Sequence, residues 1–220
     1  VDIDANGKAM PLARWPNPGE SELTIGETYR GAFQTSEANG PAEFACSHPR
    51  FERWREANDI WMDGMWGHLW AAKKIPVERI DIETGRIHAG AGSGYGVRTG
   101  QPLHFINLLE EIDKPGEWYL DRDTGMLYFY PPDEIDEHTD FPTVHFPVQE
   151  HPFITMNDVH NVAIIGLSFE LNRSDAIIMK DCEDCMIAGC SIRRMGGNGI
   201  VARGGHRVVL ACNDLISLGA

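Results

Sequence analysis

The sequence predicts an all-β protein in which an inserted antiparallel β-sandwich-like module precedes the first coils of a right-handed parallel β-helix. Three observations support this prediction. The C-terminal part repeats with a period of 23 residues, in copies at 154–176, 177–199 and 200–220. The part before it contains hairpin-like runs without that repeat. The 23 glycines and 13 prolines among 220 residues suit a turn-rich β protein better than a helical bundle. We therefore place the module at residues 1–150 and the coils at residues 151–220.

Two β-hairpins are predicted within the module. Residues 77–88 and 118–130 each contain a β-rich run, a turn reading Glu-Thr-Gly or Asp-Thr-Gly, and a second β-rich run. Gly85 and Gly125 occupy the turn position that needs a positive φ, where a β-carbon would clash. These runs are therefore expected to pair as antiparallel strands.

The remaining module segments are predicted to be short helices and loops. Helical spacing of apolar residues favours one helix near residues 49–58 and a second at 105–112, which the following Pro-Gly ends. The proline-rich stretch 131–152 is expected to be a linker or a sheet-edge segment leading into the coils. The glycine-rich run 90–96 lacks the Gly-Lys-Ser/Thr ending of a phosphate loop, so a flexible loop between strands is expected.

Apolar residues fall into columns when the three copies of the repeat are written in register. A period of this length indicates stacked units, none of which can bury its apolar face alone. The apolar runs between Asp, Asn, Gly and Arg corners are too short for helices, so each column is expected to be a stack of inward-facing strand residues. The columns are Ile154, Ile177 and Ile200; Met156, Met179 and Ala202; Val162, Cys185 and Val208; Ile164, Ile187 and Leu210; Phe169, Ile192 and Leu215.

The repeat also decides how the cysteines are interpreted. Cys182 and Cys185 have the Cys-x-x-Cys spacing of a zinc site. However, Cys185 stands in a valine column, and Cys190 stands one period after Leu167. We therefore predict that these cysteines pack as small buried apolar residues and that they form neither a metal site nor a disulfide framework. No cofactor motif is present.

The charge balance excludes some partners. The formal net charge is −14, with 19 Lys and Arg against 33 Asp and Glu, and no basic stripe is visible, which argues against nucleic acid. It also argues mildly against a polyanionic substrate. No stretch approaches the 18 apolar residues of a membrane span.

Three tryptophans and a histidine gather within ten residues. Trp61, Trp66, His68 and Trp70 could line a glycan subsite, because sugars stack their C–H faces on aromatic rings. The alternative is that these rings fill the core of the module or its boundary with the coils, and we favour this alternative.

Several segments in order resemble a known family. They are residues 7–17, residues 60–70, residues 105–131 with the run Pro-Gly-Glu-Trp-Tyr-Leu-Asp, and the repeats from residue 154. Together they resemble the bacterial right-handed parallel β-helix proteins similar to glycoside hydrolase family 141. In that family a β-sandwich-like module is inserted between the first turns of the helix and its main body.

The resemblance implies a secreted or periplasmic carbohydrate-active enzyme of bacterial origin that acts on a polysaccharide or oligosaccharide. It also implies paired catalytic acids on coils that follow residue 220, so no catalytic residue is transferred to this chain. We expect the C-terminal coils to be missing, and this chain need not be active alone.

Within the chain, Asp175 and Asp214 are the acidic residues retained as weak catalytic candidates, because glycoside hydrolysis uses two facing carboxylates. Two alternatives stay open. A polysaccharide lyase on the same scaffold would use a basic residue such as Arg193, Arg194 or His206. A non-catalytic module would bind glycan or brace the coils.

Overall fold

The computed structural model describes residues 3–132 and 143–219, and strands dominate them. The chain divides into two compact units. The first combines the described residues up to Met10 with those from residue 143 onward, and the second begins at Pro11 and runs to residue 132. The second unit is thus inserted into the first along the sequence. The expected boundary at residue 150 differs from this division, because the N-terminal strands pair with a strand that ends before residue 150.

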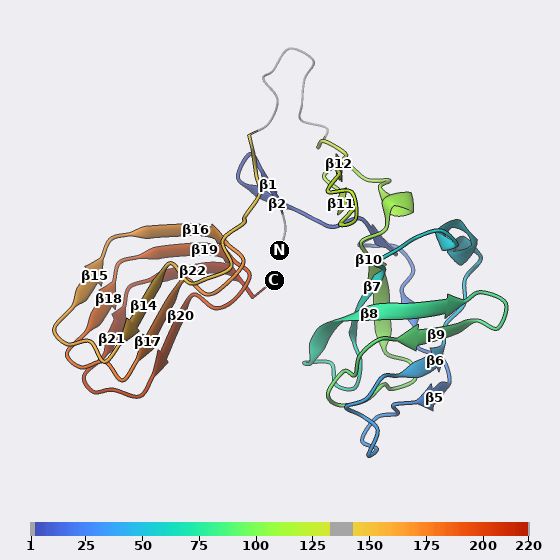
Figure 1. Ribbon diagram of the computed structural model, residues 1–220, viewed down its shortest axis with the longest axis horizontal. Helices are drawn as coiled ribbons and strands as arrows, with labels where there is room; N and C mark the ends of the chain where they lie inside the picture. The colour runs from blue at the N-terminus through green and yellow to red at the C-terminus, as the bar shows by residue number, and fades with distance from the viewer. Residues whose placement is uncertain (1–2, 133–142, 220) are drawn as a thin grey trace, which may run out of the picture. The chain divides into compact units, whose positions relative to one another are not determined.

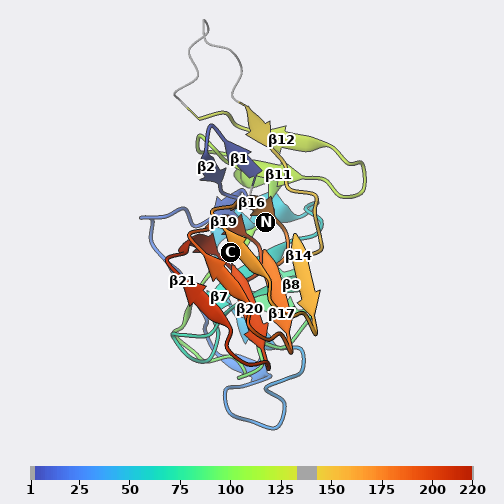
Figure 2. The same ribbon diagram turned by 90° about the vertical axis from the view of Figure 1, so that its left-hand side faces the viewer.

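The first unit contains three parallel sheets of three strands each (Figures 1 and 2). The chain passes through the three sheets in turn and repeats this passage three times, so every sheet takes one strand from each copy of the repeat. The sheets are β14 (Ile154–Asn157), β17 (Ile177–Lys180) and β20 (Ile200–Arg203); β15 (Ala163–Ile165), β18 (Met186–Ala188) and β21 (Val209–Ala211); and β16 (Ser168–Asn172), β19 (Ser191–Met195) and β22 (Asp214–Leu218).

The strand register confirms four of the five predicted columns; the column of Val162, Cys185 and Val208 lies outside the strands. Ile154, Ile177 and Ile200 are direct partners across the first sheet. The columns that end at Leu210 and Leu215 are confirmed in the same way. Each partner lies 23 positions further along the chain, so the period of the sequence is the period of the structure.

Four positions of the repeat, three at corners and one inside the third strand of each copy, adopt left-handed backbone conformations in all three copies. Their φ angles lie between 50° and 68°. Such angles strain most residues, and Gly, Asn and Asp tolerate them best, which explains why these residues predominate at the three corner positions. The positions are Asp158, Asp181 and Gly204; Asn161, Asp184 and Arg207; Gly166, Gly189 and Cys212; and Leu171, Arg194 and Ser217.

The middle copy of the repeat supplies most of the core of this unit. Ile177, Ile187 and Ile192 are fully buried. Cys182, Cys185 and Cys190 are buried in the same core as free thiols, which confirms that they pack as small apolar residues.

Three short antiparallel strands complete the first unit, namely β1 (Ile3–Ala5), β2 (Lys8–Met10) and β13 (Val144–His145). Asp4 is buried and pairs with Arg194 of β19. β13 is an edge strand, which agrees with the sheet-edge expectation for the proline-rich stretch; residues 133–142 of that stretch lie outside the described residues.

The second unit is built on one antiparallel sheet of eight strands (Figure 1). Its order is β3-β10-β7-β8-β9-β6-β5, and β4 also pairs with β10. The strands are β3 (Arg14–Trp15), β4 (Leu23–Thr24), β5 (Thr28–Arg30), β6 (Glu43–Ala45), β7 (Trp61–Met65), β8 (Ala72–Asp81), β9 (Arg86–Ala89) and β10 (Pro102–Ile106). The pairing register shifts within β8, between Val77 and Arg79. Both halves of the sheet contribute to one apolar core, which contains Phe44 and Ile87 from one half and Met62 and Phe105 from the other.

Both predicted hairpins are confirmed. β8 pairs with β9, and β11 (Trp118–Leu120) pairs with β12 (Leu127–Phe129) in a separate two-stranded sheet. Gly85 and Gly125 have φ angles of 68° and 73°.

The helix predictions are only partly correct. The first predicted helix is a 3₁₀ helix, η1 (Pro49–Trp54). The second is wrong in its first half, because Phe105 and Ile106 belong to β10 and pair with β7 and β3. Asn107 then leaves the strand with a φ of 63°, and a short 3₁₀ turn, η2 (Leu109–Glu111), follows. Strand pairing on both sides of β10 overrides the local helical pattern.

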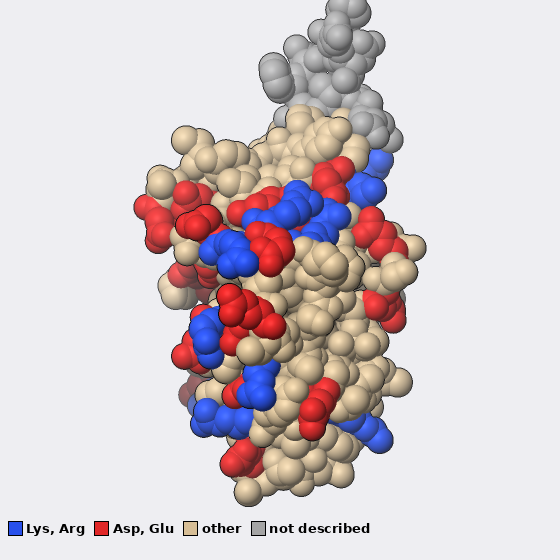
Figure 3. Space-filling view, turned by 90° about the vertical axis from the view of Figure 1, so that its right-hand side faces the viewer, with Lys and Arg blue, Asp and Glu red and all other residues tan. Residues whose placement is uncertain are grey.

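No helix among the described residues is long and apolar enough to cross a membrane. On the face of the second unit drawn in Figure 3, basic and acidic side chains lie interspersed.

Candidate functional site

Four aromatic rings of the second unit gather at the β7–β8 hairpin and the neighbouring loops. The rings of His68 and Trp70 are stacked, with centroids 4.8 Å apart and an angle of 15° between them. The Tyr95 ring meets both edge-on, with centroids 5.2 Å from each, and Phe33 meets His68 edge-on at 5.0 Å. We call Phe33, His68, Trp70 and Tyr95 the aromatic platform.

The platform combines large apolar rings with solvent exposure. Trp70 is 69% exposed and Tyr95 is 44% exposed. An exposed tryptophan ordinarily has rotational freedom, but here the stacked and edge-on neighbours restrict its ring. The platform therefore presents a continuous aromatic surface to solvent.

Gly67 allows the rings to approach each other. A β-carbon at this position would lie 2.8 Å from a ring carbon of Phe33 and 3.0 Å from Cβ of Tyr95. The guanidinium of Arg98 lies 5.1 Å from the centroid of the Phe33 ring, which places a cation at the edge of the platform.

The structure separates the three clustered tryptophans. Trp66 is 1% exposed, packs on Phe44 and donates its indole N–H to the carbonyl oxygen of Lys73 at 2.7 Å, so it is a core residue that cannot stack on a sugar at the surface. Trp61 is half-buried and donates its indole N–H to Asp59 at 2.8 Å. Trp70 and His68 are the two predicted binding residues that the structure brings together.

The candidate acids lie in the first unit and have other neighbours. Oδ1 of Asp175 accepts the backbone N–H of Asn198 at 2.5 Å and its side-chain amide at 3.0 Å, so this carboxylate connects two successive copies of the repeat. Asp214 is exposed and follows Ser191 in the strand register. Neither carboxylate stands opposite a second one in these columns.

The basic residues considered for lyase chemistry also have other partners, and Arg193 and Arg194 both lie near Glu170. Arg194 pairs with Asp4, and Nε of Arg193 donates to the hydroxyl of Ser191 at 2.9 Å. His206 lies in a corner column below Glu183. Among the described residues, no group of three or more His, Cys, Asp or Glu side chains is arranged to hold a metal ion.

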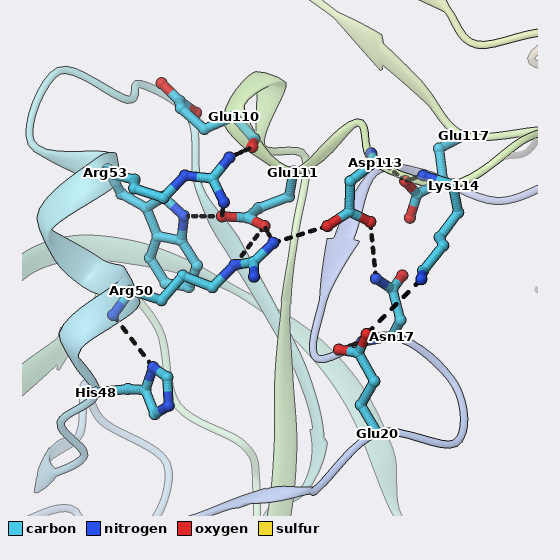
Figure 4. A network of polar contacts seen from close by, with 11 residues as sticks. Asn17, Glu20, His48, Arg50, Arg53, Glu110, Glu111, Asp113, Lys114 and Glu117 are labelled. Atoms are coloured by element: carbon cyan, nitrogen blue, oxygen red, sulfur yellow. Dashed lines mark hydrogen bonds and ion pairs between the residues drawn. The ribbon is translucent and has the colours of Figure 1, made fainter.

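A partly buried polar network crosses the second unit (Figure 4). Glu111 is fully buried and accepts the indole N–H of Trp54 and the Nε–H of Arg50, both at 2.7 Å. Hydrogen bonding to Glu111 raises the pKa of Arg50 further. Arg50 also contacts Asp113 at 2.7 Å, and Asp113 accepts the side-chain amide of Asn17 at 2.9 Å. Because each member is paired, the network fixes the loop that carries Asn17 against the sheet.

Sequence reasoning missed Phe33 and Tyr95. They lie far from the tryptophan cluster in the sequence and reach it through long loops, so local spacing gives no signal for them. The sequence also contains no indication that Phe33 and Tyr95 approach Gly67 closely.

No protein-family model matches the sequence, and no curated protein matches it significantly. A solved structure described as a glycoside hydrolase is similar to this chain, with a TM-score of 0.69 and 14% sequence identity. The similarity covers 92% of this chain and 48% of that protein, so the chain spans about half of its length. At this identity the likeness concerns the fold.

Proposed function

We propose that this chain is part of a carbohydrate-active protein and that the aromatic platform binds glycan. The observation that carries this proposal is that Trp70 is 69% exposed while its ring stacks on that of His68. The structural likeness to a glycoside hydrolase supports the same class of ligand.

The chemistry of the platform suits a sugar ring. The C–H groups on one face of a pyranose form an apolar surface that packs on an aromatic ring, while its hydroxyl groups remain at the edge for hydrogen bonds. Exposed tryptophan and tyrosine supply such a surface with few side-chain torsions to restrict on binding. The polar edges of His68 and Tyr95 can meet hydroxyl groups.

We also propose the finer architecture and activity. The three parallel sheets are the first coils of a right-handed parallel β-helix, and the second unit is a sandwich-like module inserted before them. On this proposal the protein is a secreted or periplasmic glycoside hydrolase that cleaves its substrate with paired carboxylates. The 23-residue register and the likeness in fold support this proposal.

Binding to a panel of polysaccharides tests the platform. Trp70→Ala is compared with Leu69→Ala, since Leu69 is the adjacent residue and is 70% exposed. We expect Trp70→Ala to weaken polysaccharide binding by about tenfold or more, which corresponds to a loss of about 1.4 kcal/mol of binding free energy. Leu69→Ala should bind like the unmodified chain.

The measurement is affinity electrophoresis or calorimetry, with circular dichroism as the control for folding. Equal binding by the folded Trp70→Ala chain would refute the platform. The absence of binding to every glycan by the parent chain would also count against it.

A further inference from the structure

A second site lies on the outward face of the sheet in the second unit. His104 of β10, Asp63 of β7 and Lys74 of β8 are direct partners across three neighbouring strands. The adjacent row, which contains Phe105, Met62 and Ile75, points into the core and is fully buried. Because side chains alternate between the faces of a sheet, the polar row lies on the side away from the core.

Two members of this row, His104 and Asp63, are only partly open to solvent, whereas Lys74 is exposed. The side chains of His104 and Asp63 are 22% and 25% exposed, and their Nε2 and Oδ2 atoms are 4.0 Å apart. The loop of residues 16–22 lies beside them and forms one wall of an open pocket of about 430 Å³. We call it the polar pocket; its lining includes Arg14, Glu20, Glu22, Asp63, Met65 and His104.

The polar network of Figure 4 holds the wall of the polar pocket in place. Asn17 donates its side-chain amide to Asp113, and its backbone N–H donates to Glu20 at 3.0 Å. Glu20 also lies 4.0 Å from the ammonium group of Lys114. Glu117 accepts the backbone N–H groups of Asp113 and Lys114 at 2.9 and 2.8 Å. These contacts connect the wall of the polar pocket to the segment of residues 113–117.

The charges around the polar pocket favour a neutral ligand rich in hydroxyl groups. Burial and then the charge of Arg14 lower the pKa of His104 to about 4, so its imidazole is uncharged at neutral pH. Burial likewise lowers the pKa of Arg14, which nonetheless stays protonated and donates its Nε–H to the carbonyl oxygen of Pro16 at 3.0 Å. Hydrogen-bond donors thus stand beside carboxylate acceptors.

The apolar part of the pocket suits the same ligand. Met65, Pro102 and Leu103 contribute apolar lining, and the volume falls within the range of about 300–1,000 Å³ that is usual for small-molecule sites. Three carboxylates, from Glu20, Glu22 and Asp63, line the pocket together with one cation, Arg14, so an anionic sugar would meet an excess of like charge.

We propose that the polar pocket binds one neutral sugar unit, with Asp63 accepting hydrogen bonds from its hydroxyl groups and Arg14 and His104 flanking it. This inference rests on the proposed glycan binding, because Met65 and Ala72 line the pocket and also close the β7–β8 hairpin whose loop carries Trp70. The platform and the pocket thus lie along one hairpin. The pocket adds hydrogen-bonding specificity to the stacking that the platform provides.

Titration of the full chain with neutral monosaccharides and with uronic acids tests the proposal. We expect saturable binding of at least one neutral sugar and chemical-shift changes at the His104 ring. Asp63→Asn is expected to weaken that binding by about tenfold, since a hydrogen bond to a charged group is lost. Glu78→Gln makes the same change of charge at an exposed position on β8 and should bind like the parent.

The two sites fail in distinguishable ways. If the pocket binds as proposed, Trp70→Ala retains monosaccharide binding while it loses polysaccharide binding. His104→Gln is the second variant, and it is used if Asp63→Asn does not fold. Preferential binding of uronic acids would overturn the proposal, as would unchanged affinity in a folded Asp63→Asn or His104→Gln chain.

Discussion

Truncation of one column residue in two copies of the repeat tests how the first unit is stabilised. Ile187 and Leu210 are partners in adjacent strands, but Ile187 is fully buried whereas Leu210 is 47% exposed. Ile187 has a strand on either side, and Leu210 lies on an edge strand of its sheet. Ile187→Ala is therefore expected to lower the free energy of unfolding by about 2–5 kcal/mol. Leu210→Ala loses about half of a transfer energy of about 1.5–3 kcal/mol, which is about 1 kcal/mol.

Urea titration can assign the effect to the correct unit. All six tryptophans and all five tyrosines lie between residues 11 and 130, so intrinsic fluorescence follows the second unit alone. Far-ultraviolet circular dichroism follows both units. With an m-value of about 1–3 kcal/mol/M, a loss of 3 kcal/mol shifts the midpoint by about 1–3 M. The shift is expected in the unfolding transition of the first unit, which circular dichroism detects and fluorescence does not.

The comparison between the variants carries the test, since both remove aliphatic atoms from the same column. The expected result is a shift for Ile187→Ala at least twice that for Leu210→Ala. An equal or larger shift for Leu210→Ala would refute the argument that the middle copy is enclosed by its neighbours.

Three further predictions follow from individual side chains. In the native chain, Cys212 should react rapidly with a thiol reagent while the other four cysteines stay protected, as measured by mass spectrometry, because it is exposed and they are buried; fast labelling of more than one thiol would contradict this. His104 has an ordinary pKa of 6.5 when unfolded but about 4 when folded, so its contribution to stability is lost as the pH falls from about 6.5 to about 4; His104→Gln should flatten that part of a plot of urea midpoint against pH. Gly67→Ala should weaken polysaccharide binding without unfolding the chain, because its β-carbon displaces the rings of Phe33 and Tyr95; binding equal to that of the parent chain would argue against a preformed platform.

The first unit was readable from the sequence because its structure is periodic. A core position such as Ile177 has an equivalent one period before and after it, and the strand register follows directly from the alignment of the copies. The same alignment identified Cys185 as a core residue. It did not show that the N-terminal residues belong with this unit, because the pairing of Asp4 with His145 joins segments that share no pattern.

The second unit was predictable only where a turn fixes its neighbours. Gly85 and Gly125 predicted the turns of the two hairpins, since few residues tolerate a positive φ. Phe105 and Ile106 were read as helical, because the partners that hold them in a strand come from distant parts of the chain. The polar pocket could not be predicted from the sequence for the same reason, because His104 and Asp63 become neighbours only through the order of the strands.

The three clustered tryptophans should respond differently to truncation, because one hairpin serves both the core and the surface. Trp66 follows the end of β7 and turns into the core, so Trp66→Ala is expected to cost about 3–5 kcal/mol of stability. Trp70 lies in the loop at the tip of the hairpin, where its ring contacts those of His68 and Tyr95. Trp70→Ala should therefore reduce glycan binding while it lowers the free energy of unfolding by less than about 1 kcal/mol. Trp61 lies on the same outward face as Asp63 and is half-buried. The loss of stability in Trp61→Ala should therefore lie between the losses in Trp66→Ala and Trp70→Ala. If Trp70→Ala destabilised the chain as much as Trp66→Ala, the platform would be a structural element and its role in binding would lose its support.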